Sequence, residues 1–98
     1  MSLTGKQRRH LRSLGNRLRV CAVIGRAGVN KNNITEIKDA FIDSELLKIK
    51  LIKSEDTDRK EIAQAVAKKS GSELVQVLGQ TILIYKLNEV KSEIKFPK

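Results

Sequence analysis

Apolar residues recur every three to four positions in three stretches of the chain, a spacing that predicts amphipathic helices. The three predicted helices cover about residues 4–17, 32–44 and, after a capping residue among 56–58, the segment through 69. Thr4 is expected to cap the first helix, and Gly71 is expected to close the last one as a C-terminal cap.

Four shorter stretches predict β-strands, which cover residues 19–24, 46–53, 73–78 and 81–87. The first is a continuous apolar run rich in β-branched residues, which predicts a buried strand. In the second, Leu47 and Ile49 alternate with Lys48 and Lys50, so one face of that strand should be buried. The last two strands are separated by Gly79-Gln80, which predicts a tight antiparallel hairpin.

The elements follow the order α-β-α-β-α-β-β, which is typical of an α/β fold. Alternating helices and strands favour right-handed crossovers within one sheet, and the final hairpin makes that four-stranded sheet mixed. With 98 residues, of which 40% are hydrophobic, the chain is expected to form a single compact domain. This domain should cover residues 1–87, followed by a polar tail at 88–98 that is partly ordered at most.

The charge is distributed unevenly along the chain. The net charge is +9, and the first 35 residues contain eight basic and no acidic residues. The remaining 63 residues contain 12 basic and 11 acidic residues, a difference of +1. Such a concentration indicates a face that binds a polyanion. The alternative, a basic surface that only keeps the protein in solution, would normally intersperse both signs.

Two segments within this basic third are candidate binding sites. The first predicted helix carries Lys6, Arg8, Arg9 and Arg12 opposite its leucine stripe, so one side can pack while the other meets a ligand. The second candidate is the loop between the first strand and the second helix, where glycines flank two residues and a basic residue follows: Gly25, Arg26, Ala27, Gly28 and Lys31. Glycines at such a place let backbone N–H groups approach a phosphate closely, although a simple turn is the alternative.

Catalytic chemistry is not expected. His10 borders the leucine stripe and is predicted to be a packing residue, and Cys21 lies in the predicted buried strand as an inert thiol. No nucleophile with a base, cluster of metal ligands or glycine-rich nucleotide loop is present, which predicts no enzyme, cofactor, metal or small-molecule substrate. No apolar run is long enough to cross a membrane, and a cytoplasmic location is expected.

Several motifs in this chain resemble those of the CRM domain family, named for chloroplast RNA splicing and ribosome maturation. The resemblance begins in Leu3-Thr4-Gly5-Lys6-Gln7-Arg8 with Leu11-Arg12, and it continues in three further segments at 24–29, 45–50 and 73–81. It extends to about Lys86 and is similar to the stand-alone bacterial YhbY type. The family loop usually reads Gly-Lys-x-Gly, whereas this chain has Arg26, which retains the charge but favours bidentate contacts.

The resemblance implies a fold similar to the C-terminal domain of bacterial translation initiation factor three. It also implies RNA binding and association with precursors of the large ribosomal subunit. The leading hypothesis is therefore that the helix charges hold phosphates of structured ribosomal RNA beside the glycine loop. The alternative is a ribosome-associated protein-interaction module that uses the sheet face around Gln76 and Tyr85, with RNA contact secondary.

Overall fold

In the computed structural model, residues 3–25, 28–52, 58–88, 94 and 96 are described. The predicted order of helices and strands is confirmed. The elements are α1 (Gly5–Gly15), β1 (Val20–Ile24), α2 (Lys31–Asp43), β2 (Leu46–Leu51), α3 (Arg59–Ser70), β3 (Glu73–Leu78) and β4 (Thr81–Tyr85).

The helix ends form where the local sequence supplies capping groups. Thr4 caps α1, as predicted: its Oγ1 accepts the Gln7 N–H at 3.1 Å, and the Gln7 side chain accepts the Thr4 N–H at 2.9 Å. Asn30 caps α2, which therefore begins at Lys31, one residue before its predicted start. Gly71 closes α3 with a φ of +71°, a left-handed conformation that favours glycine, and this prediction is also confirmed.

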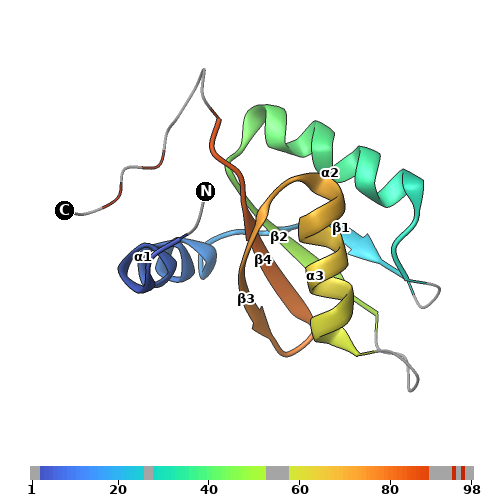
Figure 1. Ribbon diagram of the computed structural model, residues 1–98, viewed down its shortest axis with the longest axis horizontal. Helices are drawn as coiled ribbons and strands as arrows, with labels where there is room; N and C mark the ends of the chain where they lie inside the picture. The colour runs from blue at the N-terminus through green and yellow to red at the C-terminus, as the bar shows by residue number, and fades with distance from the viewer. Residues whose placement is uncertain (1–2, 26–27, 53–57, 89–93, 95, 97–98) are drawn as a thin grey trace.

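The four strands form one mixed sheet in the order β1-β2-β4-β3. β1 and β2 run parallel, and the other two pairings are antiparallel. The helices are divided between the two sides of the sheet: α2 and α3 lie on one side, and α1 lies on the other (Figure 1). The sheet therefore has a well-covered face and a face that a single helix must cover.

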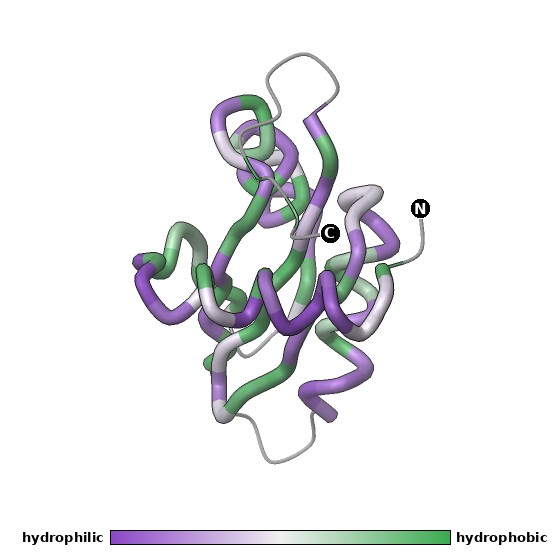
Figure 2. Tube along the Cα trace, turned by 90° about the vertical axis from the view of Figure 1, so that its left-hand side faces the viewer, coloured by the Kyte–Doolittle hydropathy of each residue, from purple (hydrophilic) through white to green (hydrophobic). Residues whose placement is uncertain are grey.

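Each face of the sheet has its own hydrophobic cluster. The larger cluster joins the strands to Ile37 and Phe41 of α2 and to Val66 of α3. The smaller cluster lies under α1, where Leu11 packs against Leu83 and its neighbours. Figure 2, turned so that the α1 side faces the viewer, shows a mostly hydrophilic helix in front of mostly hydrophobic strands. Only a narrow stripe of α1 is therefore used for packing.

β1 differs from its prediction. It lies at the edge of the sheet and alternates in burial, so that Ala22 and Ile24 are buried whereas Val20, Cys21 and Val23 are exposed. A continuous apolar run predicted a buried strand, but α1 does not reach this edge and leaves the outward side chains uncovered. β4 also ends earlier than predicted, at Tyr85.

Both edge strands contain an irregularity. The pairing register shifts between Val20 and Ala22 in β1 and between Leu74 and Gln76 in β3, which marks a β-bulge in each. The inner pair, β2 with β4, keeps an unbroken register across five residue pairs. The central pairing is thus the one without a register shift.

Parts of the C-terminal segment contact the domain. Ile94 and Phe96 pack against the cluster beneath α1, and Asn88 donates its side-chain Nδ2 hydrogen to the Ile42 carbonyl at 3.2 Å. The mostly polar composition of residues 88–98 gave no sign of this packing by Ile94 and Phe96.

Candidate nucleic-acid interface

The outer side of α1 presents three basic residues to solvent. Lys6, Arg9 and Arg12 are exposed, whereas Leu11 and Gly15 on the opposite side are buried against the sheet. The helix contains no acidic residue, so its surface charge is entirely positive. The positive charges repel one another, so binding of a polyanion to this surface lowers the free energy.

Arg8 has a different environment from its neighbours. It is half-buried, and its Nη1 donates a hydrogen bond to the backbone carbonyl of Leu74 in β3. This bond fixes α1 to the edge strand and satisfies an acceptor of β3. The sequence predicts Arg8 as a phosphate ligand, and the helical wheel could not show that β3 would lie within its reach.

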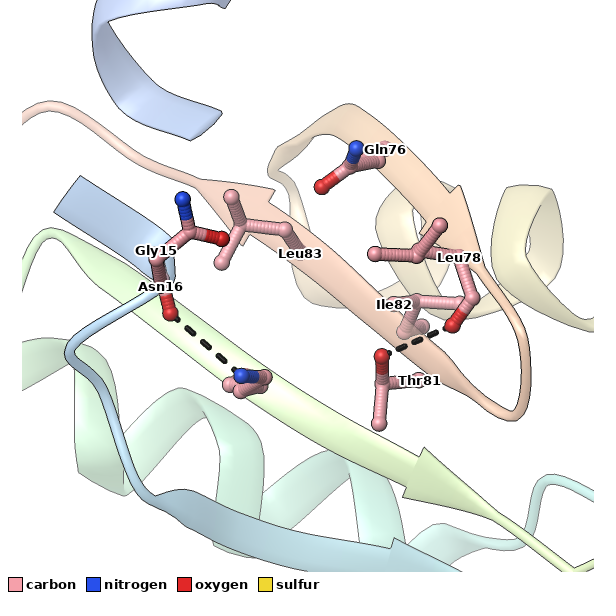
Figure 3. Close-up of a pocket in the computed structure, with 8 residues that line it drawn as sticks. Gly15, Asn16, Gln76, Leu78, Thr81, Ile82 and Leu83 are labelled. Atoms are coloured by element: carbon pink, nitrogen blue, oxygen red, sulfur yellow. Dashed lines mark hydrogen bonds between the residues drawn. The ribbon is translucent and has the colours of Figure 1, made fainter. Parts of the chain in front are cut away.

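Gly15 lets α1 approach the sheet closely. A Cβ atom at this position would lie 2.7 Å from Cδ2 of Leu83, which is too close for a real contact. The Gly15 carbonyl also accepts a hydrogen bond from Nζ of Lys48 at 3.4 Å, shown as a dashed line in Figure 3. The end of α1 is therefore held against β2 and β4 by close packing and by a lysine from the sheet.

The glycine loop begins directly after β1. The Gly28 N–H donates to the Gly25 carbonyl at 3.0 Å, and Gly28 has a φ of +86°, so the described ends of the loop form a turn that favours glycine. Gly25 is exposed. Arg26 and Ala27 lie outside the described residues.

Next to this turn, the start of α2 borders an open hollow of about 510 Å³. The residues that line it are Val29, Asn30, Lys31, Ile34, Thr35 and Lys69. Lys31 was a sequence candidate, whereas Lys69 comes from the end of α3 and was missed, because its position beside the turn depends on how the helices pack. Two lysines and the N-terminus of α2 make this hollow electropositive.

The two candidate segments do not lie beside each other. α1 lies at one end of the long axis of the molecule and the β1–α2 connection lies toward the other (Figure 1). The expectation that the α1 charges sit beside the glycine turn is therefore corrected: β1 runs between them. A single ligand can reach both only by extending along the sheet.

The structure also shows the surroundings of His10 and Cys21, which the sequence predicts to be a packing residue and an inert core thiol. The His10 ring lies 5.9 Å from the Phe96 ring in an edge-to-face arrangement, so the prediction of a packing residue is confirmed. Cys21 is exposed, which corrects the prediction of a core thiol. Partial desolvation, above all other causes, raises the pKa of Cys21, so less of the reactive thiolate forms than in an ordinary cysteine.

Tyr85 is buried, with 1% of its surface exposed, and its ring lies 5.7 Å from that of Phe96. It can contact neither a base nor a partner protein, so the alternative binding face around Gln76 and Tyr85 loses one of its two residues.

Within the described ranges, no three histidine, cysteine or acidic side chains gather as a metal site would require. No helix among these residues is long and apolar enough to cross a membrane.

Comparison with known proteins agrees with the fold. The CRS1 / YhbY (CRM) domain model matches residues 3–86. The chain is 39% identical over 95 residues to the Bacillus subtilis protein named "Probable RNA-binding protein YqeI", covering 97% of this chain and 99% of the relative. A Pseudomonas aeruginosa protein, also named as a probable RNA-binding protein, is 32% identical over 88 residues, which cover 90% of this chain and 85% of that one.

A solved structure is similar over almost the whole chain. It is the solution structure of the Staphylococcus aureus protein SAV1595, which is 40% identical, with a TM-score of 0.85 and coverage of 98% of this chain and 100% of that one. Sequence motifs, element order and three-dimensional fold therefore agree, and the chain belongs to the CRS1 / YhbY (CRM) domain family.

Proposed function

We propose that this protein binds RNA, mainly through contacts between exposed basic side chains and the phosphate backbone. The observation that carries the proposal is the acid-free outer side of α1, where Lys6, Arg9 and Arg12 are exposed together. The relatives of this chain that are named as RNA-binding proteins support RNA as the polyanion.

The turn from Gly25 to Gly28 is proposed as a second phosphate contact. Its backbone is accessible at Gly25, and the adjacent hollow carries Lys31 and Lys69 without an acidic lining residue. Backbone N–H groups beside a helix N-terminus are well suited to a phosphate. Arg26, from its place in the sequence, would add a bidentate partner for the same group.

The proposed target is structured ribosomal RNA in precursors of the large subunit in the cytoplasm, which the family resemblance implies. In this role the protein binds and positions RNA and performs no covalent step. His10 packs against Phe96, and the raised pKa of Cys21 disfavours the thiolate, so neither residue is suited to catalysis.

Charge reversal on α1 tests the first contact. Arg9→Glu and Arg12→Glu should each lower the affinity for RNA by about tenfold, which corresponds to about 1.4 kcal/mol. Lys38→Glu is the matched control, because Lys38 is an exposed lysine on α2, among the acidic residues of the opposite side. Equal losses for all three variants would mean that total charge matters and that α1 is not the interface.

The glycine turn can be tested at Gly25, where a Cβ would meet nothing within 4 Å and φ is not positive. Gly25→Asp should fold normally and weaken RNA binding about tenfold, because its carboxylate repels phosphate. Gly25→Asn has nearly the same shape without the charge and should bind much more tightly than Gly25→Asp. If the two variants bind equally well, the turn does not hold a phosphate.

The ribosomal target needs a separate experiment. Tagged protein should be recovered with large-subunit precursors, and ultraviolet crosslinks should map to a defined ribosomal RNA segment. Crosslinks spread evenly over unrelated RNAs would contradict the ribosomal target while leaving RNA binding intact.

A further inference from the structure

One part of the sheet face that carries α1 is left uncovered. The pairing registers place Val23, Lys50, Thr81 and Leu78 in a single row across all four strands. Lys48 and Gln76 flank Leu83 in the next row toward α1. We call these residues, without the buried Leu83, the open rows.

The outer residues of the open rows are accessible to solvent. Val23 is 47% exposed and Leu78 is 61% exposed, although both are large aliphatic residues. A small hollow lies between the rows and the end of α1, lined in part by Asn16, Lys48 and Gln76 (Figure 3). The surface thus combines aliphatic side chains with amide, hydroxyl and ammonium groups.

The open rows carry only positive charge. Lys48 and Lys50 are their ionisable members, and no acidic residue lines the hollow beside them. Lys48 donates to the Gly15 carbonyl, which leaves further ammonium hydrogens for a ligand. The helix layer on the other side of the sheet carries both signs: α2 has three exposed acids, and α3 has one, Glu61, among its basic residues. Charge complementarity therefore favours a polyanion on the open rows.

The position of the open rows links the two contacts proposed above. Asn16, directly after α1, lines the hollow, and Val23 lies two residues before Gly25. The rows therefore fill the space between the helix charges and the glycine turn, which lie at opposite ends of the molecule.

We propose that a strand of RNA crosses the open rows between α1 and the Gly25–Gly28 turn, an inference that rests on the proposed function. Lys50 and Lys48 contact phosphates, while Val23 and Leu78 pack against riboses or base faces. The rows contain no aromatic side chain, so base stacking on aromatic rings does not contribute there and phosphate contacts carry most of the affinity. The sheet is then a third RNA contact that makes one continuous site from two separated ones.

The first test is a nuclear magnetic resonance titration of the full chain with a short single-stranded RNA of mixed sequence. The methyl signals of Val23, Leu78 and Thr81 should shift on binding. Ile42 provides the control methyl, because it is 65% exposed on α2 of the opposite layer and should not respond. Shifts at α1 without shifts in the open rows would overturn the inference.

The second test is charge reversal within the rows. Lys50→Glu should weaken binding of the same RNA about tenfold and lower the salt dependence of the affinity. Lys38→Glu should change the affinity little. If Arg9→Glu weakens binding and Lys50→Glu does not, the proposed function stands and the sheet contact is wrong; the open rows would then be free for a partner protein. If the wild-type chain binds no RNA, the function itself fails.

Discussion

The carboxylate of Glu45 accepts a hydrogen bond from the backbone N–H of Ile94 at 3.2 Å and so ties the C-terminal segment to the start of β2. Its second oxygen accepts the Asn88 N–H at 3.0 Å. Glu45 is only 5% exposed, so these bonds compensate for the burial of its charge. The clamp holds Ile94 and Phe96 in the cluster beneath α1.

Removing this clamp should destabilise the protein. Glu45→Ala removes the carboxylate that accepts from two backbone N–H groups and should lower the free energy of unfolding by about 2 kcal/mol, measured by urea denaturation. Glu45→Gln keeps one acceptor oxygen and should cost less. Asp43→Ala, at an exposed position nearby, serves as the control, and a similar loss for Asp43→Ala would contradict the importance of the clamp.

The stability should depend on the Tyr85 phenol at alkaline pH. Burial, and then the negative charge of Glu45, raise the pKa of Tyr85 above its ordinary value of 10.0. The folded protein therefore holds the phenolic proton more tightly than the unfolded chain, so this contribution is present below about pH 10 and lost as the pH rises further. Tyr85→Phe should fall less in stability than wild type as the pH rises above about 10. Lysines titrate in both proteins, so parallel curves would show that the phenol has no such role.

Substitutions of the adjacent residues Arg8 and Arg9 should affect different properties, namely the stability of the fold and the affinity for RNA. Arg8→Ala removes the bond to the Leu74 carbonyl and should lower the free energy of unfolding by about 1–2 kcal/mol. Arg9→Ala should change it by less than about 0.5 kcal/mol but weaken RNA binding. Thermal unfolding and RNA titration of both variants separate docking from ligand contact. Similar stability losses in the two variants would contradict the assignment.

Gly15→Ala tests how tightly α1 packs on the sheet. Alanine in a helix normally gains about 0.5–1 kcal/mol over glycine, but the contact with Leu83 should reverse the sign by a cost of about 1–3 kcal/mol. A double-mutant cycle with Leu83→Ala should show a smaller penalty once the clashing side chain is removed. Additive effects would mean that α1 shifts freely to accommodate the new methyl group.

The affinity for RNA should fall steeply with salt. If about five phosphates are neutralised, log affinity against log salt concentration should have a slope on the order of −3.5 for a single strand. Filter-binding titrations over a range of potassium chloride concentrations measure this slope. A flat response would indicate that stacking or hydrogen bonds, and not phosphate contacts, dominate.

Much of the fold could be predicted because local signals agreed with the final packing. Thr4 and Gly71 define helix ends through short-range capping, and alternation in β2 gave the correct buried face because this strand is central. β1 was misjudged because an apolar run does not reveal whether a neighbouring helix will cover both faces. The exposure of Cys21 follows from that edge position and from the bulge, which no local pattern indicated.

The candidate site was predictable only in composition. The sequence located the basic segment and the glycine turn, but it could not show that β1 separates them. Arg8 was included because its residue type matches a phosphate ligand, while its partner, Leu74, lies 66 residues away. Lys50 and Lys69, which we propose as further contacts, were not among the sequence candidates, since their positions beside the other candidates depend on contacts between distant elements.

The bulges in β1 and β3 have a consequence for the protein in concentrated solution. An unpaired strand at the edge of a sheet can recruit a strand from another molecule, and repeated recruitment produces aggregates. Here each of the two outer strands is interrupted by an extra residue, at Cys21 and at Val75, so neither offers a regular ladder to an incoming strand. The irregular edges thus protect a small open sheet from edge-to-edge aggregation while leaving its exposed face available.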